Sequence, residues 1–205
     1  KYVFYSMDLR PQVETPPLPN SSAKPPVPHD FRLELAGDSD LKHIMAARPF
    51  YYTEEHLKKR FQAGHMCFLG WIKNEPVHLR WHFINSLYLP YLKRTLRLAN
   101  QEVWADEAYT HPVHRRSGIY AYAGNLITRS LAEMNYQRLS CAFASWNASP
   151  QRIALERGMK RIGEVVYYNY IIQQRFVYSG LIHEGEGNSI EIGEKTLQNS
   201  NEQRD

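Results

Sequence analysis

The sequence predicts a mixed α/β (α+β) fold, in which a central, mostly antiparallel mixed sheet carries helices on both faces. The predicted elements follow the order strand, two helices, three strands, helix, strand, helix and strands. Mixed runs of this kind are typical of a sheet covered on both sides. A hairpin with period-two alternation lies in the middle of the chain, and the long helix after it can connect two parallel neighbouring strands.

Two segments precede this sheet. Lys1 to Leu9 alternates as a strand would, and a proline-rich stretch from Pro11 to Pro28 follows it. Because proline lacks an amide donor and fixes φ, we expect this stretch to be a linker or a surface-hugging arm. A ligand for a peptide-recognition partner is the alternative. Residues 1–30 are therefore predicted to form an N-terminal strand and arm.

Residues 31–182 are predicted to form one folded domain, since a chain of 205 residues suits a single continuous core. In its first half, periodicity and cap residues predict a strand at 31–35, a helix from Asp38 or Ser39 to Ala47, a helix from Thr53 to near Gly64, and a hairpin of strands 65–73 and 77–85. In its second half they predict a strand at 102–111, a helix at 120–135, a strand at 139–144, a short helix at 150–157, and strands at 161–173 and 175–182. The polar residues 183–205 are predicted to be a disordered tail.

Composition argues against several classes of protein. The net charge of +4 and the pI of about 9.0 are too modest for a nucleic-acid module. No run approaches the roughly 18 apolar residues of a membrane span. Cys67 and Cys141 lie in apolar strand-like runs, so we expect two buried thiols and a cytoplasmic protein. The chain starts with Lys and shows no signal-peptide pattern, which favours a trimmed chain or a fragment.

The segment 109–120 has the pattern of a phosphate site. A strand ends at Pro112, a short basic turn ends at Gly118, and a helix-forming run follows. The first amides of a helix lack intrahelical partners, and the helix dipole adds positive charge there. Arg115 and Arg116 add two permanent charges, so this helix start is predicted to bind a phosphate or a pyrophosphate.

Two motifs in this region resemble those of the GNAT N-acetyltransferase superfamily. Arg115-Arg-Ser-Gly-Ile-Tyr120 resembles the family's Arg/Gln-x-x-Gly-x-Gly/Ala signature, with Tyr120 in place of the usual Gly or Ala. Asn147 to Met159 resembles the second motif, an Asn followed by a helix that ends before Gly-Phe, with Met159 in the place of Phe. The resemblance covers residues 102–170 well and residues 31–100 by pattern.

This resemblance implies the GNAT acyl-CoA acyltransferase fold, with acetyl-CoA (coenzyme A carrying the acetyl group) as co-substrate and no metal. The pyrophosphate would lie on the helix start, and the rest of the cofactor would enter the gap where the fourth and fifth strands splay apart. The cofactor-binding residues carried over on this basis are Tyr109, Thr110, His111, Arg115, Arg116, Ser117, Gly118, Ile119, Tyr120, Asn147 and Ser149.

Acyl transfer to an amine needs a base, because only the neutral amine attacks. GNAT members often draw this base from an acid on the fourth strand, where Asp106 and Glu107 are the candidates. Strand side chains alternate, so we expect the two on opposite faces; Glu107 is slightly preferred because Tyr109 and His111 share its face. A solvated or ion-paired acid is the alternative. An amide freed near residues 109–111 is expected to stabilise the oxyanion.

The strand 77–85 carries His78, Arg80 and His82 on one face. One hypothesis is that these residues bind the acceptor, with Arg80 suited to a carboxylate or phosphate on it. The alternative is a face that is simply exposed to water. Metal binding by the two histidines is disfavoured, because no further ligand is evident.

The helix at 150–157 departs from the family pattern. Leu155 is taken to stand where many members have a tyrosine general acid, so the leaving thiolate would need Tyr120, Tyr109, water or no donor at all. Asn147 can contact the pantetheine arm or cap the helix, and Ser149 can cap it as well.

The sequence therefore favours an enzyme, an acyl-CoA-dependent N-acyltransferase that moves acetyl to a primary amine by direct attack in a ternary complex. Two alternatives stay open: a CoA-binding regulatory domain without turnover, and an acyltransferase for long acyl chains on CoA or a carrier protein. The fold does not select the acceptor, a small-molecule or peptide amine. A homodimer through the N-terminal arm or the C-terminal strands is also open.

Overall fold

The computed structural model describes residues 1–10, 27–170 and 174–193. Within these ranges the strands are β1 Tyr2–Asp8, β2 Phe31–Ala36, β3 Met66–Ile72, β4 Glu75–Phe83, β5 Ser86–Leu89, β6 Arg94–Arg97, β7 Glu102–Thr110, β8 Arg138–Ala144, β9 Lys160–Asn169, β10 Gln174–Gly180, β11 Ile182–Glu184 and β12 Ile190–Ile192. The α-helices are α1 Leu41–Ala47, α2 Glu54–Gln62, α3 Ile119–Glu133 and α4 Ala148–Glu156. The expected proline-rich arm lies largely outside the described residues.

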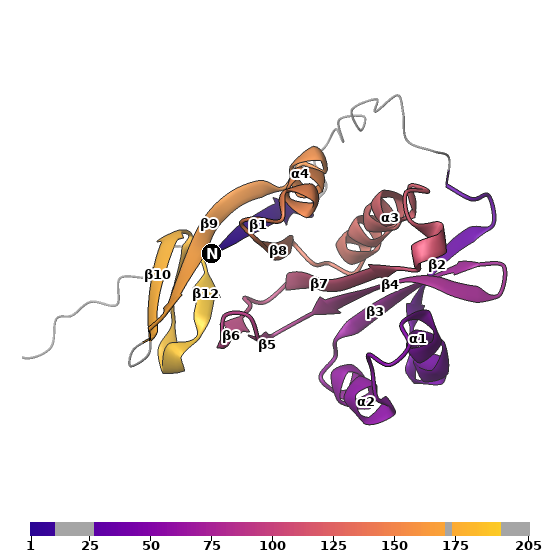
Figure 1. Cartoon of the computed structure of the whole chain (residues 1–205), viewed down its shortest axis with the longest axis horizontal. Helices are drawn as coiled ribbons and strands as arrows, with labels where there is room; N and C mark the ends of the chain where they lie inside the picture. The colour runs from indigo at the N-terminus through magenta and orange to yellow at the C-terminus, as the bar shows by residue number, and fades with distance from the viewer. Residues whose placement is uncertain (11–26, 171–173, 194–205) are drawn as a thin grey trace, which may run out of the picture.

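One eight-stranded sheet forms the centre of the molecule, in the order β10-β9-β1-β8-β7-β4-β3-β2. Helices α1 and α2 lie on one side of it and α3 and α4 on the other (Figure 1). Neighbouring strands are antiparallel except β7 and β8, which are parallel and joined by the crossover helix α3. The predicted mixed sheet with helices on both faces is therefore confirmed.

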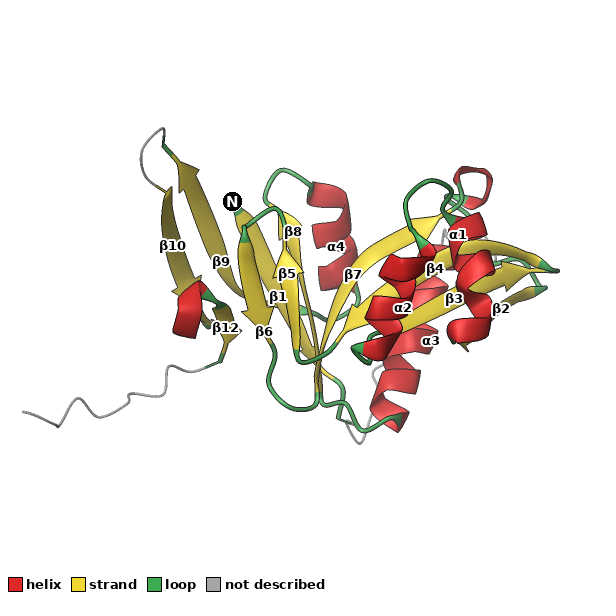
Figure 2. Ribbon diagram, turned by 90° about the horizontal axis from the view of Figure 1, so that it is seen from below, coloured by secondary structure: helices red, strands yellow, loops and turns green. Residues whose placement is uncertain are grey.

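The two parallel strands separate soon after they meet. The segment Glu102–Trp104 of β7 pairs with Arg138–Ser140 of β8, although β7 continues to Thr110 and β8 to Ala144. Figure 2 shows the two halves of the sheet turning away from each other beyond this point. The facing edges of β7 and β8 are thus left without strand pairing to each other, which leaves backbone groups for a ligand between them.

The N-terminal strand belongs to this sheet. The predicted strand is confirmed as β1, which pairs antiparallel with both β8 and β9: Tyr2 faces Ala144 on one side and Val165 on the other. Phe4 is fully buried, and its ring centroid lies 5.5 Å from that of Trp104. β1 therefore links β9 and β10 to the rest of the sheet.

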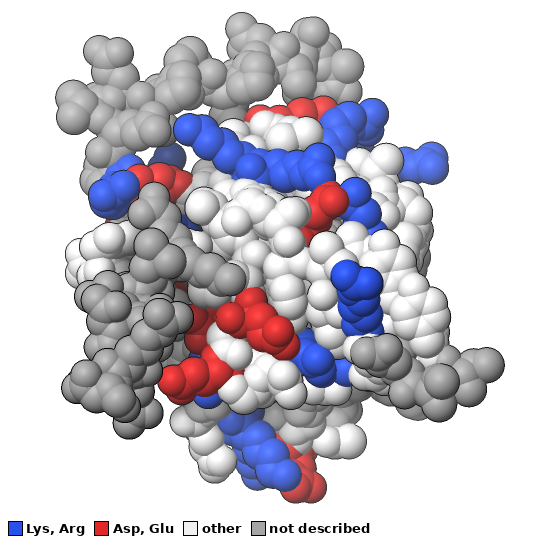
Figure 3. All heavy atoms as spheres, turned by 90° about the vertical axis from the view of Figure 1, so that its left-hand side faces the viewer, with Lys and Arg blue, Asp and Glu red and all other residues white. Residues whose placement is uncertain are grey.

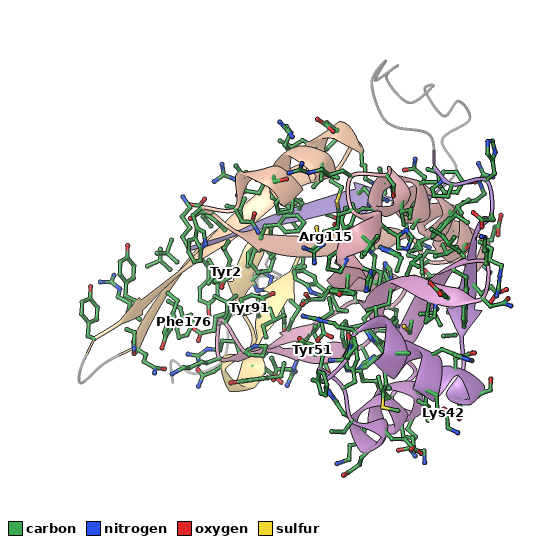
Figure 4. All side chains as sticks on the ribbon, turned by 45° about the vertical axis from the view of Figure 1, so that its right-hand side comes forward. Tyr2, Lys42, Tyr51, Tyr91, Arg115 and Phe176 are labelled. Carbon is green, nitrogen blue, oxygen red and sulfur yellow. The ribbon has the colours of Figure 1, made fainter. Side chains whose placement is uncertain are left out.

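A second, smaller sheet has the order β11-β12-β6-β5. Figure 4 shows Tyr2 of β1 beside Tyr91, which lies between β5 and β6; their rings stack at 4.3 Å. The prediction of a disordered tail is wrong for residues 183–193, because Ile190 pairs with Leu96 and both are fully buried. Residues 194–205 lie outside the described part. Strands β5 and β6 were not expected.

Both faces of β4 are buried. Its apolar side chains pack beneath α1 and α2. Its polar side chains, His78, Arg80 and His82, lie on the side of α3, where the rings of His78 and Tyr120 are 6.3 Å apart. The alternative of a face exposed to water is therefore wrong, because α3 covers it.

The four predicted helices are confirmed as α1 to α4, with closely matching ends. At the start of α2, the Thr53 hydroxyl accepts a hydrogen bond from the His56 amide at 3.2 Å. Both cysteines are buried free thiols, as expected. Among the described residues, no helix has the length and apolar character needed to cross a bilayer.

Charged side chains of both signs lie on the end of the molecule that carries β10 (Figure 3). Lys and Arg are most prominent along its upper edge and Asp and Glu in its lower centre, but both signs also occur elsewhere on the face among uncharged residues. On the described atoms of this face, the positive charge is therefore not continuous, in keeping with the modest net charge of +4.

Candidate active site

A β-bulge interrupts β7 beside β4. Between the pairs Leu79–Tyr109 and Trp81–Asp106, one residue of β4 faces two residues of β7. Glu107, in the bulge, has a φ of 46°. A bulge bends a strand and redirects its side chains. The strict alternation expected for Asp106 and Glu107 is therefore broken, and both residues line each of two cavities that meet here.

The first cavity has a volume of about 360 Å³ and lies where β7 and β8 separate, on the side of α3 and α4. β7 contributes residues 105–108, and β8 contributes residue 139 and residues 141–143. Arg80 comes from β4, Tyr120 from the first turn of α3, and the remaining lining residues from α4 and its two ends. A groove thus leads from the start of α3 between the diverging strands.

The loop that leads into α3 is accessible beside this cavity. Arg115 and Arg116 are exposed, and Ser117 and Gly118 are half-buried. Figure 4 labels Arg115, which belongs to this loop. Gly118 is the N-cap of α3 with a φ of 79°, a left-handed conformation that glycine adopts without strain. The Tyr122 amide donates to the Gly118 carbonyl at 3.0 Å and begins the helical ladder. The amides of α3 before Tyr122 precede this first hydrogen bond, so they have no carbonyl partner within the helix.

The second cavity, of about 810 Å³, lies on the side of α2. It is lined by Tyr51, His56, Lys59, Arg60, His65, Phe83, Ser86, Leu87, Tyr88, Pro90, Thr95, Asp106 and Glu107. Its charged side chains are two of each sign. Burial lowers the pKa of His56 and of His65, so both are neutral near pH 7. The bulge in β7 therefore lies between the first cavity, on the side of α3 and α4, and the second cavity, on the side of α2, whose positive and negative charges balance.

Solved aminoglycoside acetyltransferases have a fold similar to that of about two thirds of this chain. AAC(6')-Iy, in complex with the bisubstrate analogue CoA-S-monomethyl-acetylneamine, matches with a TM-score of 0.52 and 12% identity over 68% of this chain and 97% of that chain. AAC(6')-Ih from Acinetobacter baumannii matches with a TM-score of 0.51 and 15% identity over 70% and 99% of the two chains. The chain has the GNAT N-acetyltransferase fold.

The same AAC(6')-Iy in complex with CoA matches with a TM-score of 0.52 and 12% identity over 69% of this chain and 95% of that chain. No protein-family model matches the sequence, and no curated protein matches it. At these identities the likeness shows the GNAT fold, and the chemistry has to be argued from the residues themselves.

Most residues predicted to hold the cofactor lie around the first cavity of this GNAT fold. Tyr120, Asn147 and Ser149 line it, and residues 115–119 form the loop and the start of α3. The side chain of Ile119 is an exception, because it is buried in the protein. The roles of these residues toward CoA stay a prediction.

The predicted residues at the end of β7 are engaged with their neighbours. Thr110 Oγ1 lies 2.9 Å from His78 Nδ1, and the Thr110 carbonyl accepts from Arg115 Nε at 3.2 Å. The His111 amide donates to the Val77 carbonyl at 2.8 Å. The expectation of a freed amide is therefore wrong at residue 111, since β4 continues alongside it.

The start of α4 is held by Gln151 rather than by the expected cap. Among the described residues, neither Asn147 nor Ser149 forms a side-chain hydrogen bond that caps the first turn of α4. Gln151 Nε2 instead donates to the carbonyls of residues 144, 145 and 147 at 3.0 to 3.1 Å. The Asn147 side chain is therefore left at the edge of the first cavity.

The two candidate bases have different surroundings. Arg60 donates to both carboxylate oxygens of Glu107, at 2.6 and 2.9 Å, and the Tyr52 hydroxyl donates to it at 3.0 Å. Asp106 accepts the Glu107 amide at 2.7 Å, and burial raises the pKa of this carboxyl. The ion-paired alternative thus describes Glu107, whereas Asp106 has no ion pair among the described residues and its pKa is raised by burial.

The three polar residues of β4 separate into two groups. Arg80 lines the first cavity, and its guanidinium carbon lies 4.3 Å from the centroid of the Tyr120 ring. His78 and His82 are among the lining residues of neither cavity. Burial lowers the pKa of His78 to about 3, so it is neutral. No group of three or more His, Cys, Asp or Glu within the described ranges is arranged to hold a metal ion.

Three residues that the structure places at the candidate site were not selected from the sequence. Arg60 follows Leu57 by one helical turn on the buried face of α2, and an arginine on such a face is a signal that a buried acid lies opposite. Arg157 lines the first cavity from the end of α4. On α4 itself, Ala154 is buried and lines the first cavity, whereas Leu155 is 53% exposed. Ala154, and not Leu155, therefore faces the first cavity.

Proposed function

We propose that the chain is an acyl-CoA-dependent N-acyltransferase. The observation that carries the proposal is that Asp106 and Glu107, at the bulge of β7, line two cavities on the two sides of the sheet. A thioester in the first cavity and an amine in the second would meet at these residues. The GNAT fold supports the proposal, as does the CoA bound by AAC(6')-Iy.

The cofactor would lie along the groove that begins at α3. Its pyrophosphate would accept hydrogen bonds from the amides at the helix start, and the exposed Arg115 and Arg116 would add attraction that is sensitive to salt. The pantetheine arm would run between the edges of β7 and β8 past Asn147. Tyr120 leaves the helix start open, since its ring packs on Arg80 of β4.

Asp106 is the proton acceptor in this proposal. The acceptor arrives as an ammonium, loses a proton to the Asp106 carboxylate directly or through water, and its nitrogen then bonds to the thioester carbonyl carbon. The carbon–sulfur bond breaks, the nitrogen of the new amide gives its second proton to water, and CoA leaves as a thiolate that takes up a proton from Tyr120 or water. Because Arg60 and Tyr52 occupy the Glu107 carboxylate, Glu107 holds the bulge and does not carry the proton.

The acceptor is a small-molecule amine in this proposal, which the neighbours' aminoglycoside substrates support. The second cavity balances Lys59 and Arg60 against Asp106 and Glu107. Such a lining does not attract a polycation, since attraction of that kind needs an excess of acidic groups. An amine with little net positive charge fits it better.

Two measurements test the function. Isothermal titration with CoA and acetyl-CoA should show saturable binding, and incubation of acetyl-CoA with a panel of amines should release free thiol in proportion to the amide formed. Binding without turnover on any amine would support the alternative, a CoA-binding domain without catalytic activity. The alanine at position 154, which offers no ionisable side chain to the first cavity, also favours that alternative. Absence of CoA binding would end the proposal.

A further inference from the structure

Two arginines lie inside the first cavity without an acidic partner. Arg80 is 4% exposed; its guanidinium lies over the Tyr120 ring, and within the described ranges it forms no ion pair. Arg157 Nη2 donates to the Gly124 carbonyl and to the Thr128 hydroxyl, both at 2.7 Å. Its Nε is buried and has no hydrogen-bond partner in the described part of the chain. Both side chains line the cavity.

The cavity wall has two acids, Asp106 and Glu107, and within the described ranges neither forms an ion pair with Arg80 or Arg157. Burial, and then the positive charge of Arg80, lower the pKa of Arg157 to about 10, so Arg157 stays charged at neutral pH. Burial raises the pKa of the Cys141 thiol to about 12, so this thiol is neutral. Glu107 is bound to Arg60. Like charges at low dielectric repel each other, and an anion between them would relieve that repulsion.

Arg157 lies deeper than the predicted phosphate site, whereas Arg80 contacts Tyr120 in the first turn of α3. Gly124 and Thr128, which Arg157 contacts, follow Gly118 by six and ten residues on α3, roughly 9 and 15 Å along a helix axis. A pyrophosphate bound to the amides of the first turn therefore does not reach Arg157. The group of an acyl-CoA that lies at this depth is the thioester with its acyl chain.

The helix is shaped to admit the guanidinium of Arg157. A Cβ added to Gly124 would lie 2.8 Å from the guanidinium carbon of Arg157, closer than such atoms approach. Glycine inside a helix costs about 1 kcal/mol relative to alanine. At Gly124 the absence of a Cβ leaves room for the guanidinium of Arg157 in its present position; a Cβ there would displace the end of that side chain.

We infer that Arg80 and Arg157 form an anion-binding subsite for the acyl group, and that the preferred donor is a CoA thioester whose acyl chain ends in a carboxylate. This inference rests on the proposed function. Guanidinium groups bind carboxylates through paired, charge-assisted hydrogen bonds. The transfer step is unchanged: the amine nitrogen bonds to the thioester carbon, the carbon–sulfur bond breaks, CoA leaves as the thiol, and the distal carboxylate stays intact.

The test compares succinyl-CoA with butyryl-CoA, which has the same four acyl carbons and a methyl group in place of the carboxylate. In calorimetry with the full chain, succinyl-CoA should bind at least about 10-fold more tightly, the effect of one charge-assisted contact. Arg80→Met and Arg157→Met should each remove this preference and leave the affinity for CoA within about 3-fold. Arg152→Met is the matched control on α4, because Arg152 is exposed and pairs with Glu156; it should keep the preference.

Each other outcome is decisive. Equal binding of the two thioesters by the unmodified chain overturns the inference without any variant, so a variant that fails to fold does not weaken the test. A comparable loss of CoA and succinyl-CoA binding in both arginine variants would assign the pair to the phosphates of CoA and overturn it as well. If the chain binds CoA but prefers neither thioester, the proposed function is retained and the proposed carboxylate subsite is rejected. If CoA itself does not bind, both fall.

Discussion

Arg60 of α2 holds the carboxylate of Glu107 in a two-pronged ion pair, 47 residues apart in the chain. The side chains are 10% and 21% exposed, so the pair is largely shielded from water. Tyr52 donates a third hydrogen bond to the same carboxylate at 3.0 Å. The pair ties α2 to the bulge of β7, where Glu107 has a positive φ.

Replacing Arg60 by methionine should destabilise the protein by about 3 kcal/mol, because it leaves a buried carboxylate without its partner. Urea unfolding measures the change. The double variant Arg60→Met/Glu107→Gln should recover part of the loss, since the unpaired charge is then gone. Lys58→Met is the control: Lys58 forms an exposed ion pair with Glu54, and its loss should cost less than about 1 kcal/mol. Equal losses at Arg60 and Lys58 would contradict a buried pair.

Asp106→Asn should lower kcat by roughly 10²- to 10⁴-fold, the usual contribution of a general base. CoA affinity should stay unchanged, because the proposed site of the phosphates is the start of α3, away from Asp106. The pH profile should show kcat/KM falling as the pH drops through the raised pKa of Asp106. A variant that retains full turnover would remove Asp106 from the mechanism.

The same substitution should raise the melting temperature at pH 7. Because the folded-state pKa of Asp106 is raised above the ordinary Asp value, the folded state holds this proton more tightly than the unfolded state. Stability therefore falls as the pH rises from the ordinary Asp pKa through the raised one, and at pH 7 the ionised carboxylate is a net cost that Asn removes. Thermal unfolding at pH 7 and near pH 3 should show the advantage of Asn shrinking at the lower pH.

Gly118→Ala should destabilise the protein by about 1–2 kcal/mol, because a φ of 79° is unfavourable for any residue with a Cβ. It should also weaken CoA binding by about 10-fold or more, since the amides at the start of α3 would shift. Calorimetry measures the affinity and urea unfolding the stability. Gly37→Ala is the control, because a Cβ at Gly37 meets no atom within 4 Å and its φ is −125°. A Gly118 variant as stable as that control would argue against the left-handed cap.

Phe4→Ala should cost about 3–5 kcal/mol, the loss expected for a fully buried phenyl ring. The measurement tests whether β1 is an integral strand of the sheet rather than a loosely attached arm. Phe50→Ala serves as control, because Phe50 is fully exposed and its loss should change the stability by less than about 0.5 kcal/mol. A cost below about 1 kcal/mol at Phe4 would place β1 outside the cooperative core.

The local elements of this protein were predictable from nearby residues. Thr53 and the acidic pair after it mark the start of α2, and Gly118 marks the start of α3, because capping depends on residues within one turn. The alternation of β3 and β4 follows from burial of the sheet. The order of these elements, together with the two motifs at residues 115–120 and 147–159, was enough to predict the GNAT fold.

Tertiary structure alone decided which distant segments meet. The position of β1 between β8 and β9 depends on pairing across more than a hundred residues, and the pairing of Ile190 with Leu96 turned an apparently polar tail into strands. The ion pair of Glu107 likewise depends on Arg60 from another element. Hydrophobic periodicity records which face of an element is buried; it does not record the partner that buries it.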